Sequence, residues 1–229
     1  MKFGVVVFPG SNCDRDSFYC IKDIIGKDVE YIWHKDIDVS AFDCIILPGG
    51  FSYGDYLRTG AVARFSPVMQ AIFEHVQKGG RLIGICNGFQ ILCEAHLLPG
   101  ALITNSKLKF ICKYVNLKVE NDTSDFTHLY KKSDILNIPV AHHSGCYYAD
   151  TDTIKEIEDN NQILFRYCDE NGIVSDDTNI NGSVNNIAGI INRAGNVAGM
   201  MPHPERAVED LLCSTDGIKV FKSIVEKIS

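Results

Sequence analysis

One cysteine stands in the surroundings that nucleophilic chemistry requires. Cys86 follows an apolar run at residues 82–85, which predicts a buried strand, and it precedes a helix-compatible segment at residues 87–95. Gly84 and Gly88 stand two positions to either side, and glycine relieves the crowding of a sharp strand-to-helix turn. Such a turn holds a side chain at the end of a sheet, in front of the first N–H groups of the helix. The pattern therefore predicts that Cys86 is a catalytic thiol.

A thiol attacks as the thiolate, so it needs a base or a positive neighbour. Among seven histidines, His203 is distinctive because Pro202 and Pro204 fix the backbone on both sides of it. Glu205 follows two positions later, and a histidine oriented by a carboxylate is the arrangement of a catalytic triad. We therefore predict that His203 is the base and that Glu205 orients it. The sequence alone does not establish contact between Cys86 and His203.

The segment 48–60 is richer than a plain connection between two elements. It holds four glycines, two tyrosines, an aspartate and an arginine, and it follows an apolar run at residues 44–47. Glycine can turn a backbone N–H toward a ligand without a Cβ in the way. We predict that the N–H groups of Gly50 and of Asn87 stabilise an oxyanion.

The elements that must position these residues follow the rhythm of a parallel α/β sheet. Strand-like segments alternate with helix-like segments up to residue 95, which is typical of a mostly parallel central sheet flanked by helices. Ligands bind such sheets at the carboxyl ends of the strands, and three unusual turns fall at that edge. The strands are expected at 3–8, 29–33, 44–47 and 82–85, and the helices at 15–25, 67–78 and 87–95.

The second half of the chain has a different pattern. Residues 108–120 alternate loosely, and residues 187–192 and 197–201 can form a hairpin, so an antiparallel β segment is expected there. Residues 121–133 are polar and predict an exposed loop or a short helix. A closing helix is expected at residues 217–228.

Composition limits the class of protein. A length of 229 residues is consistent with a single domain over residues 1–229, and the net charge of −7 without a Lys/Arg-rich block argues against nucleic-acid binding. No segment has the length of a membrane span. The nine cysteines are irregularly spaced without a CxxC pair, which predicts a cytoplasmic protein with reduced thiols. The adjacent His142 and His143 lack further ligands at fitting spacing, so no metal site is expected.

At this point the motifs resemble a known family. Residues 84–90 resemble the nucleophile motif of class I (triad-type) glutamine amidotransferases, and residues 202–205 resemble their His/Glu motif. Residues 8–14, 48–58 and 201–206 together are similar to the family of glutaminase subunits of phosphoribosylformylglycinamidine synthases. The resemblance extends from residue 3 to about residue 227.

This resemblance implies a flavodoxin-like amidotransferase fold and a reaction. Cys86 would attack the side-chain amide of L-glutamine, the Gly50 and Asn87 N–H groups would hold the oxyanion, and His203 would protonate the leaving ammonia. The ammonia would pass to a large synthetase subunit, which uses ATP and Mg to convert formylglycinamide ribonucleotide to the amidine in purine biosynthesis. A small bridging subunit would complete the complex, and this subunit would hold no cofactor. Gln90 and His142 are implied as substrate-binding residues.

One segment departs from the family pattern. The family commonly has Ala-His-Gly-Glu-Gly after the strand near residue 140, whereas residues 141–145 here are Ala-His-His-Ser-Gly. We therefore expect glutamine or partner recognition to differ at His143 and Ser144. Two alternatives stay open at this stage. One is a Cys-dependent hydrolase or peptidase of similar fold, and the other is a catalytically weak regulatory subunit.

Overall fold

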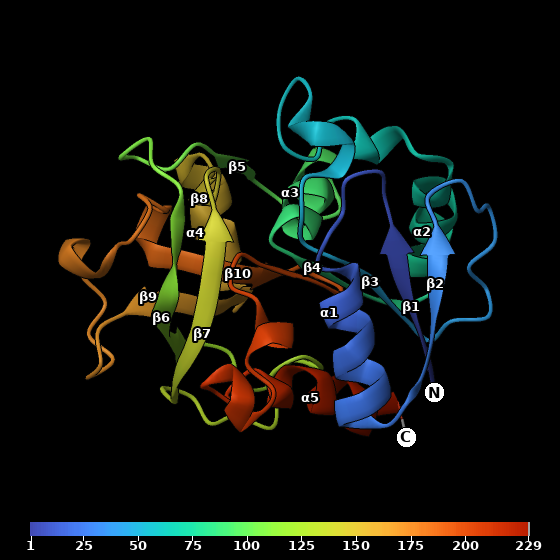
Figure 1. The fold of residues 1–229 in the computed structure, drawn as a ribbon. Helices are drawn as coiled ribbons and strands as arrows, with labels where there is room; N and C mark the ends of the chain where they lie inside the picture. Colours follow the sequence, from blue (N-terminus) through green and yellow to red (C-terminus); the bar gives the residue numbers. More distant parts are fainter. Residues whose placement is uncertain (229) are drawn as a thin grey trace.

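The computed structural model describes residues 1–228, and its centre is a nine-stranded sheet with the order β2-β1-β3-β4-β11-β10-β9-β6-β7 (Figure 1). The first five strands in this order are parallel to one another, as the βα rhythm predicts. They are β2 (Asp28–Trp33), β1 (Lys2–Val7), β3 (Cys44–Leu47), β4 (Arg81–Ile85) and β11 (Val197–Met200).

The second half of the sheet is antiparallel, which confirms the expected change of pattern. The hairpin across residues 193–196 is present, and it joins the antiparallel half to the parallel half through β11. A separate two-stranded sheet, which the sequence did not predict as such, pairs β5 (Ala101–Ile103) with β8 (Cys146–Tyr148). The antiparallel strands of the large sheet are β10 (Ile187–Ile191), β9 (Ile163–Cys168), β6 (Ile111–Val119) and β7 (Ile135–His142).

Helices cover both faces of the parallel strands. Figure 1 shows α1 and α5 on one side of these strands and α2 and α3 on the other. Where one helix was expected at residues 15–25, α1 continues into a π-helical segment, Cys20–Ile25. Among the helices of residues 1–228, none is both long and apolar enough to span a membrane. The helices are α1 (Asp14–Tyr19), α2 (Pro67–Gln77), α3 (Asn87–Glu94), α4 (Thr151–Asp159) and α5 (Ile218–Ile228).

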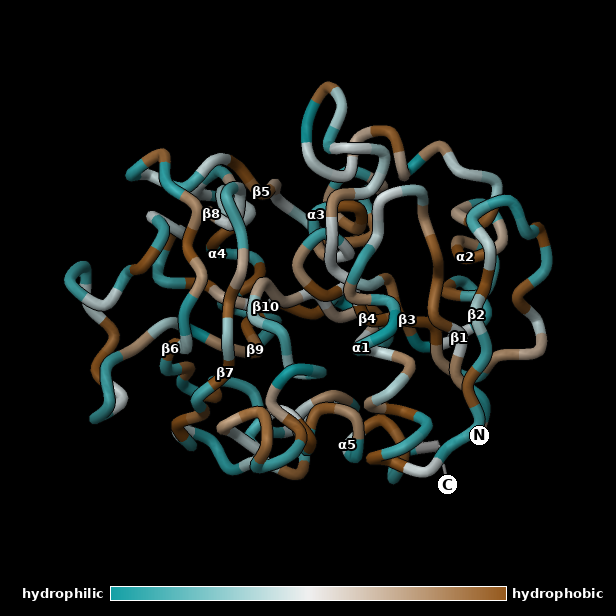
Figure 2. Tube along the Cα trace, in the orientation of Figure 1, coloured by the Kyte–Doolittle hydropathy of each residue, from teal (hydrophilic) through white to brown (hydrophobic). Residues whose placement is uncertain are grey.

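The core lies along the middle strands of the sheet. All four residues of β3 and all four of β11 are buried, because helices cover a parallel sheet on both faces. Figure 2 shows the resulting apolar traces of β1, β3 and β4 at the centre of the molecule. The carboxyl ends of β3 and β4 are therefore held by a dry, closely packed interior.

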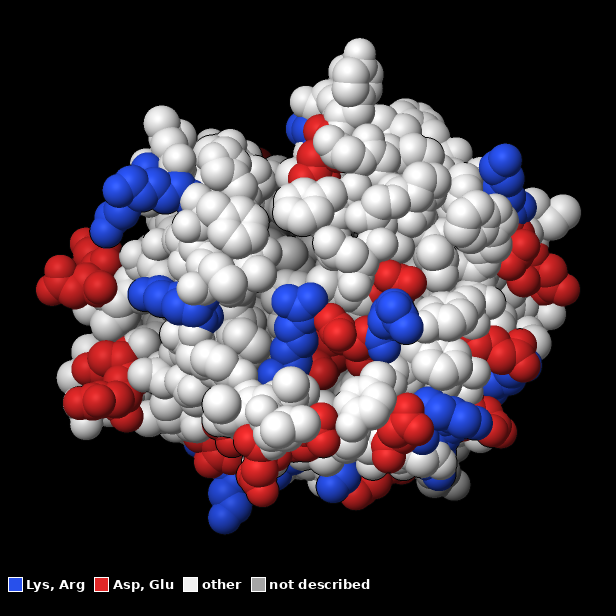
Figure 3. All heavy atoms as spheres, in the orientation of Figure 1, with Lys and Arg blue, Asp and Glu red and all other residues white. Residues whose placement is uncertain are grey.

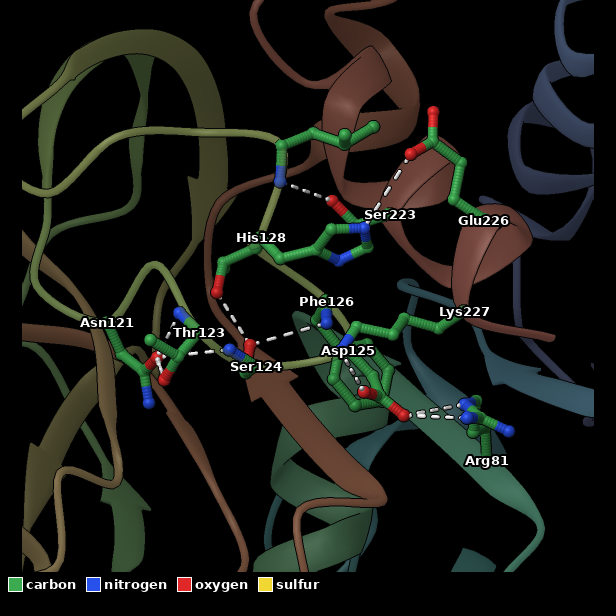
Figure 4. A network of polar contacts seen from close by, with 12 residues as sticks. Arg81, Asn121, Thr123, Ser124, Asp125, Phe126, His128, Ser223, Glu226 and Lys227 are labelled. Carbon is green, nitrogen blue, oxygen red and sulfur yellow. Dashed lines mark hydrogen bonds and ion pairs between the residues drawn. The ribbon is translucent and has the colours of Figure 1, made fainter. Parts of the chain in front are cut away.

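The segment 121–133 fastens the opposite end of the molecule (Figure 4). Asp125 accepts hydrogen bonds from the Arg81 guanidinium at 3.0 and 2.7 Å, and Lys227 of α5 lies 3.8 Å from the same carboxylate. Phe126 is buried, so the prediction of an exposed loop is wrong for this part of the segment. Isolated apolar side chains among polar neighbours are a weak signal in a sequence, yet Phe126 and Tyr130 both pack into the core.

Candidate active site

The Cys86 turn has the strained geometry that the sequence predicted. Cys86 has φ +52° and ψ −104°, a backbone conformation that residues with a side chain rarely adopt, and α3 begins at the next residue. The flanking glycines are required by space. A Cβ on Gly84 would lie 2.6 Å from the Gly88 carbonyl carbon, and one on Gly88 would lie 2.0 Å from the Leu47 carbonyl oxygen. The Cys86 N–H donates to the Met200 carbonyl at 2.8 Å, which ties the turn to the end of β11.

The structure places His203 and Glu205 together in the interior. The His203 Nδ1 lies 2.7 Å from Glu205 Oε1, and both residues are 1% exposed. The His203 N–H donates to the Pro139 carbonyl at 2.8 Å, so strand β7 also positions the imidazole. Burial alone would lower the pKa of His203, but the Glu205 carboxylate and the Cys86 thiol raise it well above its usual range. The imidazole can therefore hold a proton for transfer to a leaving group.

The side chains of His203, Cys13 and Cys86 come together beside the backbone of Gly49. A Cβ built on this glycine would lie 2.7 Å from His203 Cε1, 3.1 Å from Cys13 Sγ and 3.4 Å from Cys86 Cβ. Cys86 and His203 are 117 residues apart, and the sequence alone could not establish that they meet. The distances show that both side chains lie against Gly49. The His203 Nε2 atom forms no hydrogen bond in this state, while Nδ1 is held by Glu205. The arrangement matches a nucleophile, a base and an orienting carboxylate.

Gly49→Ala is expected to impair catalysis more than folding. The added methyl group would push on the His203 ring from 2.7 Å, and small displacements of a catalytic group reduce the rate by up to about 100-fold. Overpacking of this kind costs about 1–3 kcal/mol of stability. Steady-state rates of the reaction at Cys86 and urea unfolding of the variant check this expectation. A fully active variant would show that the ring has room to move.

The two predicted oxyanion donors are both free to bind a ligand. The Asn87 N–H is the first of α3, where no carbonyl of the helix can accept it, and within residues 1–228 neither this group nor the Gly50 N–H forms a hydrogen bond. Gly50 has φ +135°, a backbone conformation that favours glycine. Gly50 lines the same cavity as Cys86, and Asn87 directly follows Cys86 in the chain, an arrangement suited to oxyanion stabilisation.

A cavity of about 430 Å³ opens beside Cys86. Gly50, Gln90 and His142 line it, so these predicted site residues share one space with the thiol. The amide of Gln90 is already engaged, because its Oε1 accepts from Asn87 Nδ2 at 2.8 Å and its Nε2 donates to the Ser144 carbonyl at 2.6 Å. Gln90 therefore braces the cavity wall.

His142 is held in one tautomer. Asn105 Nδ2 donates to the carbonyls of Lys109 and His142. The Oδ1 of Asn105 therefore faces His142 Nδ1, at 3.1 Å, and accepts a hydrogen bond from the Nδ1–H group. Burial, and then the charge of His203, lower the pKa of His142 to about 4. His142 is therefore neutral near pH 7, and it adds no second positive charge beside His203.

The departing turn at residues 142–146 forms one wall of the cavity. His143 and Ser144 line it, and the Ser144 carbonyl accepts the hydrogen bond from Gln90. The Asn105 N–H donates to the His143 carbonyl at 2.9 Å, which fixes the turn from behind. The sequence change therefore lies where a bound molecule would be contacted.

Reasoning from the sequence assigned no definite role to two neighbours of the thiol site. Cys13 is 4% exposed, and its Sγ accepts from the Arg206 guanidinium at 3.2 Å. Cys13 Sγ also lies within 4.8 Å of a ring nitrogen of His203 and of a carboxylate oxygen of Glu205. Asp55 lines the cavity from the loop after β3. The only sequence signal for these residues was their position in turns at the carboxyl edge of the sheet.

A family model described as a CobB/CobQ-like glutamine amidotransferase domain matches residues 1–220. This chain belongs to that family of glutamine amidotransferases. The resemblance to the glutamine amidotransferases is thereby confirmed, and the amidotransferase fold accounts for the parallel sheet with the thiol turn after β4.

Named relatives within the family narrow the comparison. The chain is 56% identical to phosphoribosylformylglycinamidine synthase subunit PurQ of Aquifex aeolicus over 98% of this chain and 99% of that one. It is 55% identical to the PurQ subunit of Moorella thermoacetica over 99% and 96%. Among solved structures, PurLQS from Thermotoga maritima matches with a TM-score of 0.89 and 44% identity, covering 100% of this chain and 99% of the other. These amidotransferase relatives are matched over essentially their full length.

Proposed function

We propose that this chain hydrolyses L-glutamine to glutamate and ammonia as the glutaminase subunit of a phosphoribosylformylglycinamidine synthase. The observation that carries the proposal is the meeting of Cys86 and His203 above Gly49, with Glu205 bound to the imidazole. Relatives of this chain that carry the PurQ name are about 55% identical to it over its full length, which supports the assignment of the pathway. The catalytic domain occupies residues 1–229.

The first half-reaction forms a thioester. The Cys86 sulfur attacks the γ-carboxamide carbon, and the negative charge that develops on the carboxamide oxygen is stabilised by the Gly50 and Asn87 N–H groups. His203, which has taken the proton of the Cys86 thiol, delivers it to the amide nitrogen, the C–N bond breaks, and ammonia leaves. Glu205 holds the Nδ1 tautomer and stabilises the imidazolium through its 2.7 Å contact.

The second half-reaction restores the enzyme. Water gives a proton to His203 and attacks the thioester carbon, after which the C–S bond breaks. His203 returns this proton to the Cys86 sulfur, and glutamate leaves. The substrate lies against the cavity wall that His142 lines and that Gln90 braces through its bonds to Asn87 and Ser144. No step needs a metal or cofactor in this subunit, while ATP and Mg serve the synthetase partner.

The partners follow from the named structural match and from the surface. The name PurLQS joins a Q component with an L and an S component, which supports a large synthetase subunit and a small bridging subunit as partners. Tyr56 and Leu57 are 72% and 80% exposed on the loop after β3. Figure 3 shows this projecting loop as a largely uncharged surface, with a few charged side chains at its base. We assign the loop to contact with the synthetase subunit, which would receive the ammonia.

The state of the cysteines indicates the cellular compartment of the protein. All nine cysteines are free thiols, seven of them buried. We propose a cytoplasmic protein, because reducing compartments keep thiols in this state. A reactive Cys86 would be lost to oxidation elsewhere.

Covalent labelling tests the proposed function. Treatment with 6-diazo-5-oxo-L-norleucine, an electrophilic glutamine analogue, is expected to place one adduct on Cys86, because only this thiol faces both the cavity and the oxyanion donors. Peptide mass spectrometry locates the adduct, and excess L-glutamine should slow its formation. Cys13 provides the internal comparison, since it lies beside His203 yet does not line the cavity. An adduct on Cys13 in place of Cys86 would overturn the assignment of the nucleophile.

A further inference from the structure

The cavity beside Cys86 contains one uncompensated charge. Asp55 is the single carboxylate among its lining residues, and Arg58 is the single guanidinium. Arg58 is already neutralised, because its Nε and Nη2 contact Glu94 oxygens at 2.6 and 2.7 Å. Within residues 1–228, no ion pair involves Asp55. Its one hydrogen bond comes from Asn87 Nδ2, at a long 3.5 Å.

The loop holds Asp55 in a strained conformation. Tyr53, Asp55 and Leu57 have φ values of +54°, +54° and +69°, which non-glycine residues seldom adopt. The surrounding contacts enforce these values. The Tyr53 hydroxyl lies 2.7 Å from His34 Nδ1, and the Ser52 N–H donates to Asn87 Oδ1 at 3.1 Å. Strain that is enforced by neighbouring contacts tends to occur at functional sites.

Desolvation without a partner charge has an electrostatic consequence. Burial raises the pKa of Asp55 to about 6, because no cation stabilises the carboxylate. A positively charged group that entered the cavity beside Asp55 would reverse this penalty. The site is therefore complementary to a cation attached to the molecule that occupies the cavity.

Glutamine carries such a cation at the right end. When its carboxamide lies against Cys86, its α-ammonium group is at the far end of the side chain, directed toward the cavity rim. Asn87 connects the two positions, since it follows Cys86 in the chain and its Nδ2 lies 3.5 Å from Asp55 Oδ1. The network continues from Asn87 through Gln90 to Ser144, which also lines the cavity.

We propose that Asp55 binds the α-ammonium group of L-glutamine and is the specificity-determining residue of the pocket for an amino acid. This inference rests on the proposed glutaminase function and deepens it. Arg58 does not compete for Asp55, because Glu94 holds it.

A comparison of two substrates tests the role of Asp55 in the assembled complex with its synthetase and small subunits. L-Glutamine carries the α-ammonium group, and glutaramate is the same molecule without it. Asp55→Asn should lower kcat/KM for glutamine about 10- to 100-fold, mainly through KM, as expected for the loss of one charge-assisted hydrogen bond. The same variant should leave kcat/KM for glutaramate unchanged, which a general disturbance of the loop would not do.

Asp159→Asn, an exposed position at the end of α4, is the matched control and should change neither substrate. Equal losses on both substrates with Asp55→Asn would assign Asp55 a purely structural role and overturn the inference, as would unchanged kinetics on glutamine. A wild-type complex that releases no ammonia from glutamine would instead refute the proposed function itself. The two failures are therefore distinguishable.

Discussion

Replacing Cys86 with alanine is expected to abolish glutamine hydrolysis while leaving ammonia-dependent synthesis by the complex intact. The variant lacks the sulfur that forms the thioester, and removal of a catalytic nucleophile reduces rates by a factor on the order of 10⁴ or more. The synthetase can still use ammonia supplied in the buffer, because Cys86 plays no part in that step. Coupled assays with glutamine or with ammonium chloride as the nitrogen donor measure the two activities separately.

The matched control for this variant is Cys112→Ala. Cys112 is exposed on β6 and lies outside the cavity, so both activities should equal those of the wild type. Cys86 is packed at 5% exposure, and alanine fits within its volume, so the variant is expected to fold. Glutaminase activity that persisted in Cys86→Ala would exclude the thioester mechanism. Loss of ammonia-dependent synthesis would show that Cys86 is needed for assembly of the complex.

Local backbone chemistry made the sharp turn at Cys86 predictable from sequence. The glycines around Cys86 are needed because their neighbours would otherwise overlap, and this need is visible as a spacing of residues. His203 was predictable for a similar reason, since two prolines fix its backbone. Its contact with Cys86 was not, because it depends on the His203 N–H donating to the Pro139 carbonyl of β7. Such a contact is a property of the whole antiparallel half of the sheet.

Asp55 shows what a sequence conceals. The backbone at Tyr53 and Asp55 is left-handed, and tertiary hydrogen bonds impose this conformation. Neither residue type is sufficient to predict it from the sequence. The charge balance of the cavity was equally hidden, because the neutralisation of Arg58 depends on Glu94, which is 36 residues away on α3. In the fold, the parallel strands were predictable from their apolar runs. The pairing of β5 with β8 was not, since each strand has only three residues.

Glu205→Gln is expected to cost glutamine turnover about 100- to 10,000-fold with little change in KM. The substituted side chain at position 205 has the size of glutamate but lacks the charge that faces His203 Nδ1 at 2.7 Å. Its amide can also present an N–H to Nδ1, which would favour the wrong tautomer, and a change of this kind in a triad is among the most damaging to kcat. Stopped assays of kcat and KM, with thermal unfolding to confirm the fold, provide the measurement.

The pH profile separates orientation from charge in the same variant. The Glu205 carboxylate raises the pKa of His203, so in the wild type the imidazolium persists to higher pH than for an ordinary histidine. Activity that needs this proton is lost as pH rises through that pKa, and its loss should therefore begin at lower pH in Glu205→Gln. Glu209→Gln, which affects a carboxylate bound to the Tyr19 hydroxyl, should keep the wild-type profile. An unshifted alkaline limb in Glu205→Gln would mean that Glu205 acts on the imidazole through geometry alone.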